Sequence, residues 1–151
     1  MDKLVISVAG QNLAEIKALI NQGYDLNDPY NEHGWTPFTL AVSKKFQVSF
    51  INELIKLGGN VNQPIKDGRT PLMLSCITRN YPNVLKLLIN YGADVNAQDE
   101  NGYTALMQIL TLNKASEKRE FIKTLIEGGA DLTTIKNIYG ETALDIILNR
   151  I

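Results

Sequence analysis

The residues that could carry acid–base or nucleophilic chemistry are few. His33 is the only histidine of the chain and Cys76 is the only cysteine. A catalytic histidine needs a second group within hydrogen-bond reach, and no Ser or Cys nucleophile is indicated close to His33. One histidine and one cysteine also cannot build a zinc site by themselves. We therefore interpret His33 as an exposed loop residue and Cys76 as a buried, inert thiol, and we predict no catalytic residue and no metal site.

Carboxylates gather loosely at Asp94, Asp99 and Glu100. Calcium prefers a loop in which oxygen ligands alternate along the chain, and this stretch has no such alternation. The simpler interpretation is structural, because Asp is a common turn residue whose side chain can bond to the backbone nearby. We expect Asp94 and Asp99 to organise a turn.

Two glycine pairs could suggest a phosphate-binding loop, but neither has the necessary neighbours. Gly58-Gly59 and Gly128-Gly129 lack a following Lys-Ser/Thr, and each pair ends an apolar segment instead of beginning a helix. The chain also has no dinucleotide fingerprint, nucleophile elbow or kinase motif. We therefore predict no cofactor and no enzyme activity.

Composition narrows the class of protein further. The 151 residues are 44% hydrophobic, and 15 basic residues against 16 acidic ones give a net charge of −1. This balance argues against a dedicated nucleic-acid binder. No apolar run approaches the roughly 18 residues of a membrane span, and the start MDKLVISVAGQ has too short an apolar core for a signal peptide. With one cysteine excluding an internal disulfide, we expect a cytoplasmic, intracellular protein with neither a nucleic acid nor a membrane as partner.

Two series of glycines reveal internal repeats. The first series precedes X-Thr-(Pro/Ala)-(Leu/Phe) and consists of Gly34, Gly68, Gly102 and Gly140, which lie 34, 34 and 38 residues apart. The second series follows apolar segments and consists of Gly23, Gly58, Gly92 and Gly129, which lie 35, 34 and 37 residues apart. Two series with nearly the same step indicate a repeat architecture.

The clearest repeat runs from Gly68 to Asn96 and reads GRTPLMLSCITRNYPNVLKLLINYGADVN. Gly68 suits a tight turn, Thr70 can cap a helix, and Pro71 fits the first helical position. A second helix after Asn80-Tyr81-Pro82-Asn83 is apolar on more than one side. A face that wide needs a neighbour before it and a neighbour after it, which is typical of a stacked array.

The start Thr70-Pro71-Leu72 and the end Gly92-Ala93-Asp94-Val95-Asn96 resemble the ankyrin repeat. The resemblance covers nearly the whole chain and implies an all-α solenoid of helix-turn-helix units joined by hairpin-like loops. We expect one domain, 1–151, with five units at about 1–33, 34–67, 68–101, 102–139 and 140–151. The last unit has a first helix and no second.

Three departures from the family pattern matter. The usual His after Thr-Pro-Leu is absent, and Thr39, Met73, Met107 and Asp145 stand there; we expect the loss of a side-chain hydrogen bond. Ala105 and Ala143 replace the Pro and are good helix formers, so those helices should still form. The fourth unit has three extra residues in the Asn113 to Glu120 region, which is either a tolerated surface insertion or a partner-specific protrusion.

The resemblance implies a concave surface, made by the hairpin tips and the exposed side of each first helix, that grips other proteins. By position in the repeat we assign the partner-binding residues as His33, Trp35, Lys44, Lys66, Arg69, Glu100, Tyr103, Thr111 and Tyr139. Trp, Tyr and Arg dominate interface hot spots, which favours binding over the alternative that these are ordinary tip residues. Mixed charges along this row favour a protein partner over a polyanion.

The resulting hypothesis is a non-catalytic protein–protein interaction module, either an adaptor or an inhibitor. One alternative is an enzyme or small-molecule binder with a pocket near His33 and Trp35; another is a purely structural spacer. We expect a monomer. The last unit could support self-association if its apolar residues are left open, or they could all face inward; these residues are Leu144, Ile146, Ile147, Leu148 and Ile151.

Overall fold

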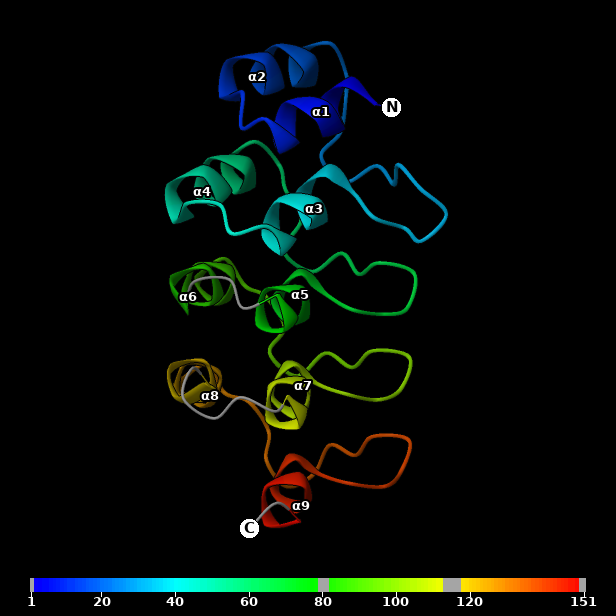
Figure 1. Ribbon diagram of the computed structural model, residues 1–151, viewed down its shortest axis with the longest axis vertical. Coiled ribbons are helices and arrows are strands. Elements are labelled where there is room, and N and C mark those ends of the chain that lie inside the picture. Colours follow the sequence, from blue (N-terminus) through cyan, green and yellow to red (C-terminus); the bar gives the residue numbers. More distant parts are fainter. Residues whose placement is uncertain (1, 79–81, 113–117, 150–151) are drawn as a thin grey trace.

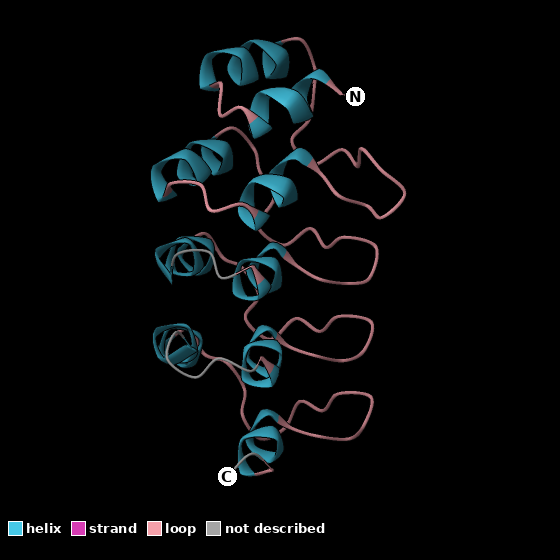
Figure 2. Ribbon diagram, viewed as in Figure 1, coloured by secondary structure: helices cyan, strands magenta, loops and turns pink. Residues whose placement is uncertain are grey.

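A computed structural model describes residues 2–78, 82–112 and 118–149, which form nine helices and no strand. Figures 1 and 2 show them as an elongated stack of helix pairs. The helices are α1 (Lys3–Ala9), α2 (Leu13–Asn21), α3 (Pro37–Ser43), α4 (Val48–Lys56), α5 (Pro71–Ile77), α6 (Pro82–Asn90), α7 (Ala105–Thr111), α8 (Lys118–Glu127) and α9 (Ala143–Leu148). The predicted all-α solenoid is confirmed.

The helices lie in two columns. The first helices of successive units, α1, α3, α5, α7 and α9, each contact the next, and α4, α6 and α8 stack beside them. The loops before α3, α5, α7 and α9 project away from both columns, as Figure 1 shows. The apolar core fills the space between the columns and continues from unit to unit. Helix pairs thus bury their apolar faces against the neighbouring pair, as the width of those faces predicts.

Threonine caps begin four of the first helices. The hydroxyl oxygens accept a hydrogen bond from the backbone N–H three residues on, which satisfies one of the orphan donors of the helix start; the capping residues are Thr36, Thr70, Thr104 and Thr142. Pro37 and Pro71 follow in two units. Ala105 and Ala143 begin helices equally well, which confirms that prediction.

The side-chain hydrogen bond at the family's histidine position is not lost in every unit. The N–H of Thr36 donates to Thr39 Oγ1 at 2.8 Å, and the N–H of Thr142 donates to Asp145 Oδ2 at 2.9 Å. Each pair completes a capping box, in which the two residues satisfy one another's backbone N–H. The expected loss is therefore wrong for these two units, because a short oxygen-bearing side chain can replace the imidazole there.

Backbone hydrogen bonds join neighbouring hairpin tips. The N–H groups of Lys66, Glu100 and Ile138 donate to the carbonyls of His33, Asp67 and Asn101 in the preceding unit, at 2.9, 3.0 and 3.0 Å. The tip glycines allow this approach. At Gly102, with φ +73°, an added Cβ would lie 2.9 Å from Asn137 Cα in the next hairpin. The tips therefore form one continuous ladder.

A second ladder of asparagine side chains lies at the loops that follow the second helices. Asn62 Nδ2 donates to the carbonyl of Gly92 at 2.9 Å, and its Oδ1 accepts from the N–H of Asp94 at 2.7 Å. Asn27 and Asn96 make the same pair of bonds to their next units. These bonds fix the step from one unit to the next. Asp94 and Asp99 accept backbone N–H groups two residues on, so their predicted role in turns is confirmed.

Three predictions fall wholly or partly outside the described residues. They concern the turn at Asn80 and Tyr81, most of the Asn113 to Glu120 insertion, and the C-terminal Ile151. Lys118 and Glu120 of the insertion lie in the first turn of α8.

Candidate functional site: a groove across three hairpins

An open groove of about 550 Å³ lies across three successive hairpins. Its lining comes from the hairpins that lead into α3, α5 and α7; each hairpin is counted from here on with the unit whose first helix it precedes, which makes these the hairpins of units two, three and four. The lining residues are His33, Trp35, Ile65, Lys66, Asp67, Arg69 and Glu100. Five of the nine residues assigned from sequence therefore lie together here: His33, Trp35, Lys66, Arg69 and Glu100. The groove is also where the enzyme alternative places its pocket, but it is open rather than enclosed.

The turn that presents each tip is fixed by an Asn or Asp in three of the four hairpins. Asn31 Oδ1 accepts the N–H groups of His33 and Trp35, both at 3.1 Å. Asp99 and Asn137 do the same for the residues two and four positions after them. Such a side chain replaces part of a backbone turn, so it holds the tip rigidly.

Unit three departs from this pattern, because Ile65 stands where the other hairpins have Asn or Asp. Its side chain is 3% exposed and contributes to the floor of the groove. Asp67 supplies the missing acceptor: its carboxylate accepts from the N–H of Arg69 at 3.2 Å and from Arg69 Nε at 2.7 Å. The groove therefore has an apolar lining residue at the hairpin whose turn differs from the others.

Arg69 and Asp67 form a close ion pair. Arg69 Nη2 lies 2.6 Å from Asp67 Oδ2, in addition to the Nε contact. Burial alone raises the pKa of Asp67, but the hydrogen bonds and charge of Arg69 outweigh it and hold that pKa below its usual range. Arg69 therefore lines the groove as a paired cation, since its charge is matched by Asp67.

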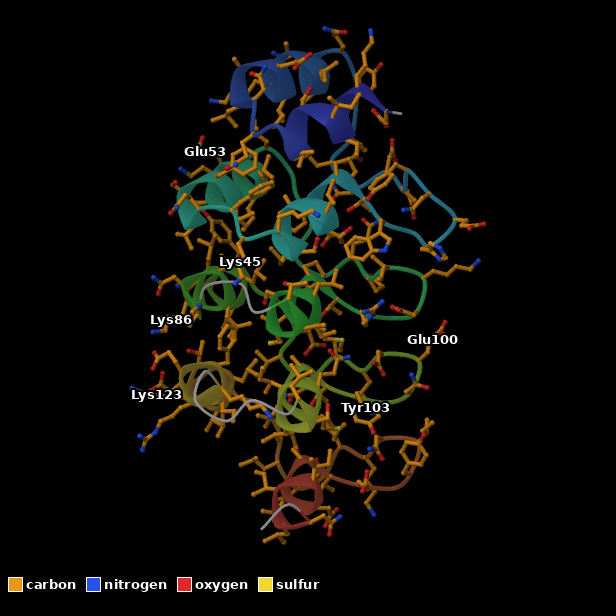
Figure 3. All side chains as sticks on the ribbon, viewed as in Figure 1. Lys45, Glu53, Lys86, Glu100, Tyr103 and Lys123 are labelled. Atoms are coloured by element: carbon orange, nitrogen blue, oxygen red, sulfur yellow. The ribbon has the colours of Figure 1, made fainter. Side chains whose placement is uncertain are left out.

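The remaining charges lie at the edge of the groove. The side chain of His33 is 73% exposed, and its Nε2 is 3.7 Å from the carboxylate of Glu32, which confirms that His33 is an exposed hairpin residue. Lys66 and Glu100 are exposed on successive tips, and Figure 3 shows Glu100 at the outer end of its loop. A cation and an anion therefore border the same groove.

The other four assigned residues lie outside the groove lining. Tyr103 is half-buried against the hairpin, and burial raises its pKa above the ordinary value. Tyr139 is 72% exposed at the tip of unit five. Lys44 and Thr111 lie at the ends of α3 and α7, where the hydroxyl of Thr111 donates to the carbonyl of Gln108 at 2.8 Å. The structure thus separates the assigned set into a central group and a peripheral one.

The residues that could act as a nucleophile or as metal ligands are considered next. Cys76 is fully buried, and burial raises the pKa of its thiol to about 12, so it stays protonated and unreactive. Within residues 2–78, 82–112 and 118–149, no three His, Cys, Asp or Glu side chains form a group that could hold a metal ion. None of the helices in these ranges is both long enough and apolar enough for a bilayer crossing.

Sequence reasoning missed two lining residues, Ile65 and Asp67. A signal for Ile65 existed, because the other hairpins carry Asn31, Asp99 and Asn137 three residues before the tip glycine. An apolar residue at a position that otherwise accepts two N–H bonds marks a changed turn. The contact of Asp67 with Arg69 had no such signal in the sequence, since it depends on the conformations of the two side chains.

Unit five exposes apolar side chains. Leu144 and Leu148 of α9 are 40% and 58% exposed, whereas Ile146 is buried and Ile147 is half-buried. The alternative in which all the apolar residues face inward is therefore wrong for Leu144 and Leu148. The counterparts of Leu144 in the other units, Phe38, Leu72 and Leu106, are at most 1% exposed.

Comparison with known proteins identifies the architecture. A family model described as ankyrin repeats in three copies matches residues 4–99 and 78–149, nearly the whole chain. The chain belongs to the ankyrin-repeat family. Ankyrin repeats are in general non-catalytic modules for protein–protein interaction. This ankyrin-repeat chain is therefore a protein–protein interaction module.

Relatives come from animals and viruses. The chain is 39% identical over 90 residues to rat ankyrin repeat and SAM domain-containing protein 6, which covers 59% of the chain and 10% of that protein. It is 32% identical over 123 residues to the mouse B-cell lymphoma 3 protein homolog, covering 80% of the chain and 25% of that protein. A Variola virus ankyrin repeat protein is 33% identical over 131 residues, which covers 82% of the chain and 22% of that protein. The chain spans a quarter or less of the length of these relatives.

Proposed function

We propose that this ankyrin-repeat chain binds a protein partner on the concave face made by its hairpins and first helices, as an adaptor or an inhibitor. The observation that carries the proposal is the groove at units two to four, where five residues assigned from sequence come together. Trp35 and Arg69 are of the types that dominate binding energy at protein interfaces.

We propose further that residues 1–151 form one domain and act inside the cell, without nucleic acid or membrane as partner.

The hairpin ladder supports this function energetically. Backbone bonds between tips and Asn or Asp side chains within them hold the groove residues in place before a partner arrives. A surface that is already ordered loses little conformational entropy on binding, so more of the contact energy appears as affinity.

The groove suits a protein better than a small molecule or a substrate. Small-molecule sites are usually enclosed and mostly apolar, whereas this groove is open and lined largely by charged side chains. His33 has only the exposed carboxylate of Glu32 beside it, and the pKa of Asp67 is held low by Arg69. Neither arrangement provides a general base with a nucleophile within reach.

A pull-down from the native source, read by mass spectrometry, tests the proposal. We expect Trp35→Ala with Arg69→Ala and Tyr103→Ala to lose the partner that the parent chain captures, because interface anchors cost about 2 kcal/mol or more when truncated. Lys123→Ala, on α8 and away from the hairpins in Figure 3, is the control and should retain it. Undiminished capture by the folded triple variant would rule out the concave face.

We also propose reversible self-association through the open face of unit five, with a monomer at low concentration. The support is the exposure of Leu144 and Leu148; the counterparts of Leu144 in the other units, Phe38, Leu72 and Leu106, are buried. A second copy offers the same apolar face for a two-fold contact. Sedimentation velocity over a wide concentration range should show a dimer that Leu148→Asp abolishes, and a monomer at every concentration would end this idea.

A further inference from the structure

The groove carries information about the chemistry of its partner, and the inference below rests on the proposed function. The first element is apolar. Trp35 and Ile65, from successive hairpins, both line the groove; Trp35 is half-buried, whereas Ile65 is only 3% exposed. An apolar side chain of a partner can cover the part of Trp35 that is still exposed, which removes it from water.

The second element is a separated pair of opposite charges. Arg69 and Asp67 neutralise one another through contacts of 2.6 and 2.7 Å, so they contribute no net charge. Among the residues that the structure describes, the side chains of Lys66 and Glu100 make no ion pair or hydrogen bond. These two charges are therefore the ones that a partner can still satisfy.

The third element is the spacing. Trp35, Lys66 and Glu100 belong to three successive units whose tips are joined by backbone hydrogen bonds, Lys66 N to His33 O and Glu100 N to Asp67 O. Lys66 and Glu100 each stand two residues before their tip glycine, so they lie one unit apart, and the spacing of stacked helices makes that step about 8–10 Å. A polyproline II segment has three residues per turn and rises about 3.1 Å per residue, so every third side chain faces the same way and one unit corresponds to three residues of such a partner. Trp35 stands one residue after its own tip glycine, in the hairpin before that of Lys66.

We propose that the groove binds an extended, polyproline II-like peptide segment that carries an apolar residue, then an acidic residue and, three residues later, a basic residue. The apolar side chain packs on Trp35, the acidic one meets Lys66, and the basic one meets Glu100. A polyanion fits this site poorly, because Glu100 repels it where Lys66 attracts it.

Selection from a phage-displayed library of random peptides on the immobilised full chain tests the proposal. We expect enriched peptides to carry the order apolar, acidic, basic, with three residues from the acidic to the basic position. The double variant Lys66→Glu with Glu100→Lys should enrich the order apolar, basic, acidic, and should bind the parent's peptides about tenfold more weakly. Loss of structure cannot produce such a reversal, so the readout separates recognition from stability.

The matched control is Lys123→Glu with Glu127→Lys, which exchanges the charges of an exposed pair on α8; it should keep the parent's peptides. Enriched peptides without the charge order, or an order unchanged by the exchange at Lys66 and Glu100, overturn the inference while the proposed function stands. A library that yields no peptide also overturns it. The proposed function fails separately, if the folded triple variant at Trp35, Arg69 and Tyr103 still captures the native partner as well as the parent chain does.

Discussion

Single carboxylates fix the geometry of the loops in this chain, and Asp131 is the strongest case. It accepts hydrogen bonds from the N–H groups of Thr133 and Thr134, at 2.8 and 2.7 Å, and from the hydroxyl of Thr134. These bonds, that of the Thr134 hydroxyl first, lower the pKa of Asp131 to about 2. The ionised form is thus favoured by the folded loop.

A pH dependence of stability follows from this shift. Because the folded pKa lies below the ordinary value, Asp131 stabilises the fold above about pH 4, and this contribution disappears as the pH falls towards 2. We expect Asp131→Asn to flatten the change in denaturation midpoint between about pH 5 and pH 2. Thr134→Val, which removes the largest single cause, should flatten it in part. An acid profile that both variants leave unaltered would contradict this account.

At the residue scale the sequence predicts what depends on residue type and position in the repeat. Asp94 and Asp99 in turns, Cys76 in the core and His33 at an exposed tip are confirmed for that reason. The pairing of Asp67 with Arg69 could not be predicted, because it arises when Ile65 leaves a turn without its usual acceptor and a neighbouring side chain rotates to supply one. The partner-binding role of the assigned residues stays a prediction.

At the scale of elements, the stacking of hairpins depends on how closely the backbone of one hairpin approaches the next. Gly102 and Gly92 both have positive φ, +73° and +85°, but only Gly102 faces another hairpin, with Asn137 Cα 2.9 Å from where a Cβ would lie. The Cβ of an alanine at Gly92 would meet nothing within 4 Å.

This contrast gives a paired prediction. Gly92→Ala should cost about 1–2 kcal/mol, the strain of a left-handed alanine. Gly102→Ala should cost clearly more, because the added methyl also pushes two hairpins apart and weakens the backbone bond from Ile138 to Asn101. Urea denaturation of the two variants measures the difference. Equal losses would mean that the hairpin ladder contributes little to stability.

Helix positions were largely predictable from sequence, since Thr caps and Pro or Ala at the first position have local causes. The capping boxes at Thr39 and Asp145 were not predicted, because the sequence comparison noted the absent His and not the oxygen atom that replaces it. The side chain that stands at such a position decides whether a departure from the family pattern weakens the helix.

At the scale of the whole molecule, the same residue contributes differently according to its place in the stack. Leu106 of α7 is fully buried between units, while its counterpart Leu144 of α9 is 40% exposed. Leu106→Ala should cost about 2–5 kcal/mol through lost burial and the cavity that it leaves. Leu144→Ala should cost less than half as much. Denaturant titration of both variants tests this, and equal values would mean that unit five is covered in solution.

The stack itself was predictable because apolar faces too wide for one helix pair require neighbours on both sides. The location of the groove was not. Repetition alone predicts a uniform row of tips from Trp35 to Tyr139, whereas the groove brings five of those residues together at units two to four, around the one hairpin whose turn differs at Ile65.

Main-chain hydrogen bonds join each hairpin tip to the next, from His33 to Lys66, Asp67 to Glu100 and Asn101 to Ile138. Gln98 adds a side-chain bond to the carbonyl of Lys136 at 2.9 Å, but the side chains of Lys66 and Glu100 take part in none of these links. Mutation can accordingly exchange Lys66 or Glu100 one codon at a time while every intermediate still folds, so one scaffold can evolve towards new targets without passing through a misfolded ancestor.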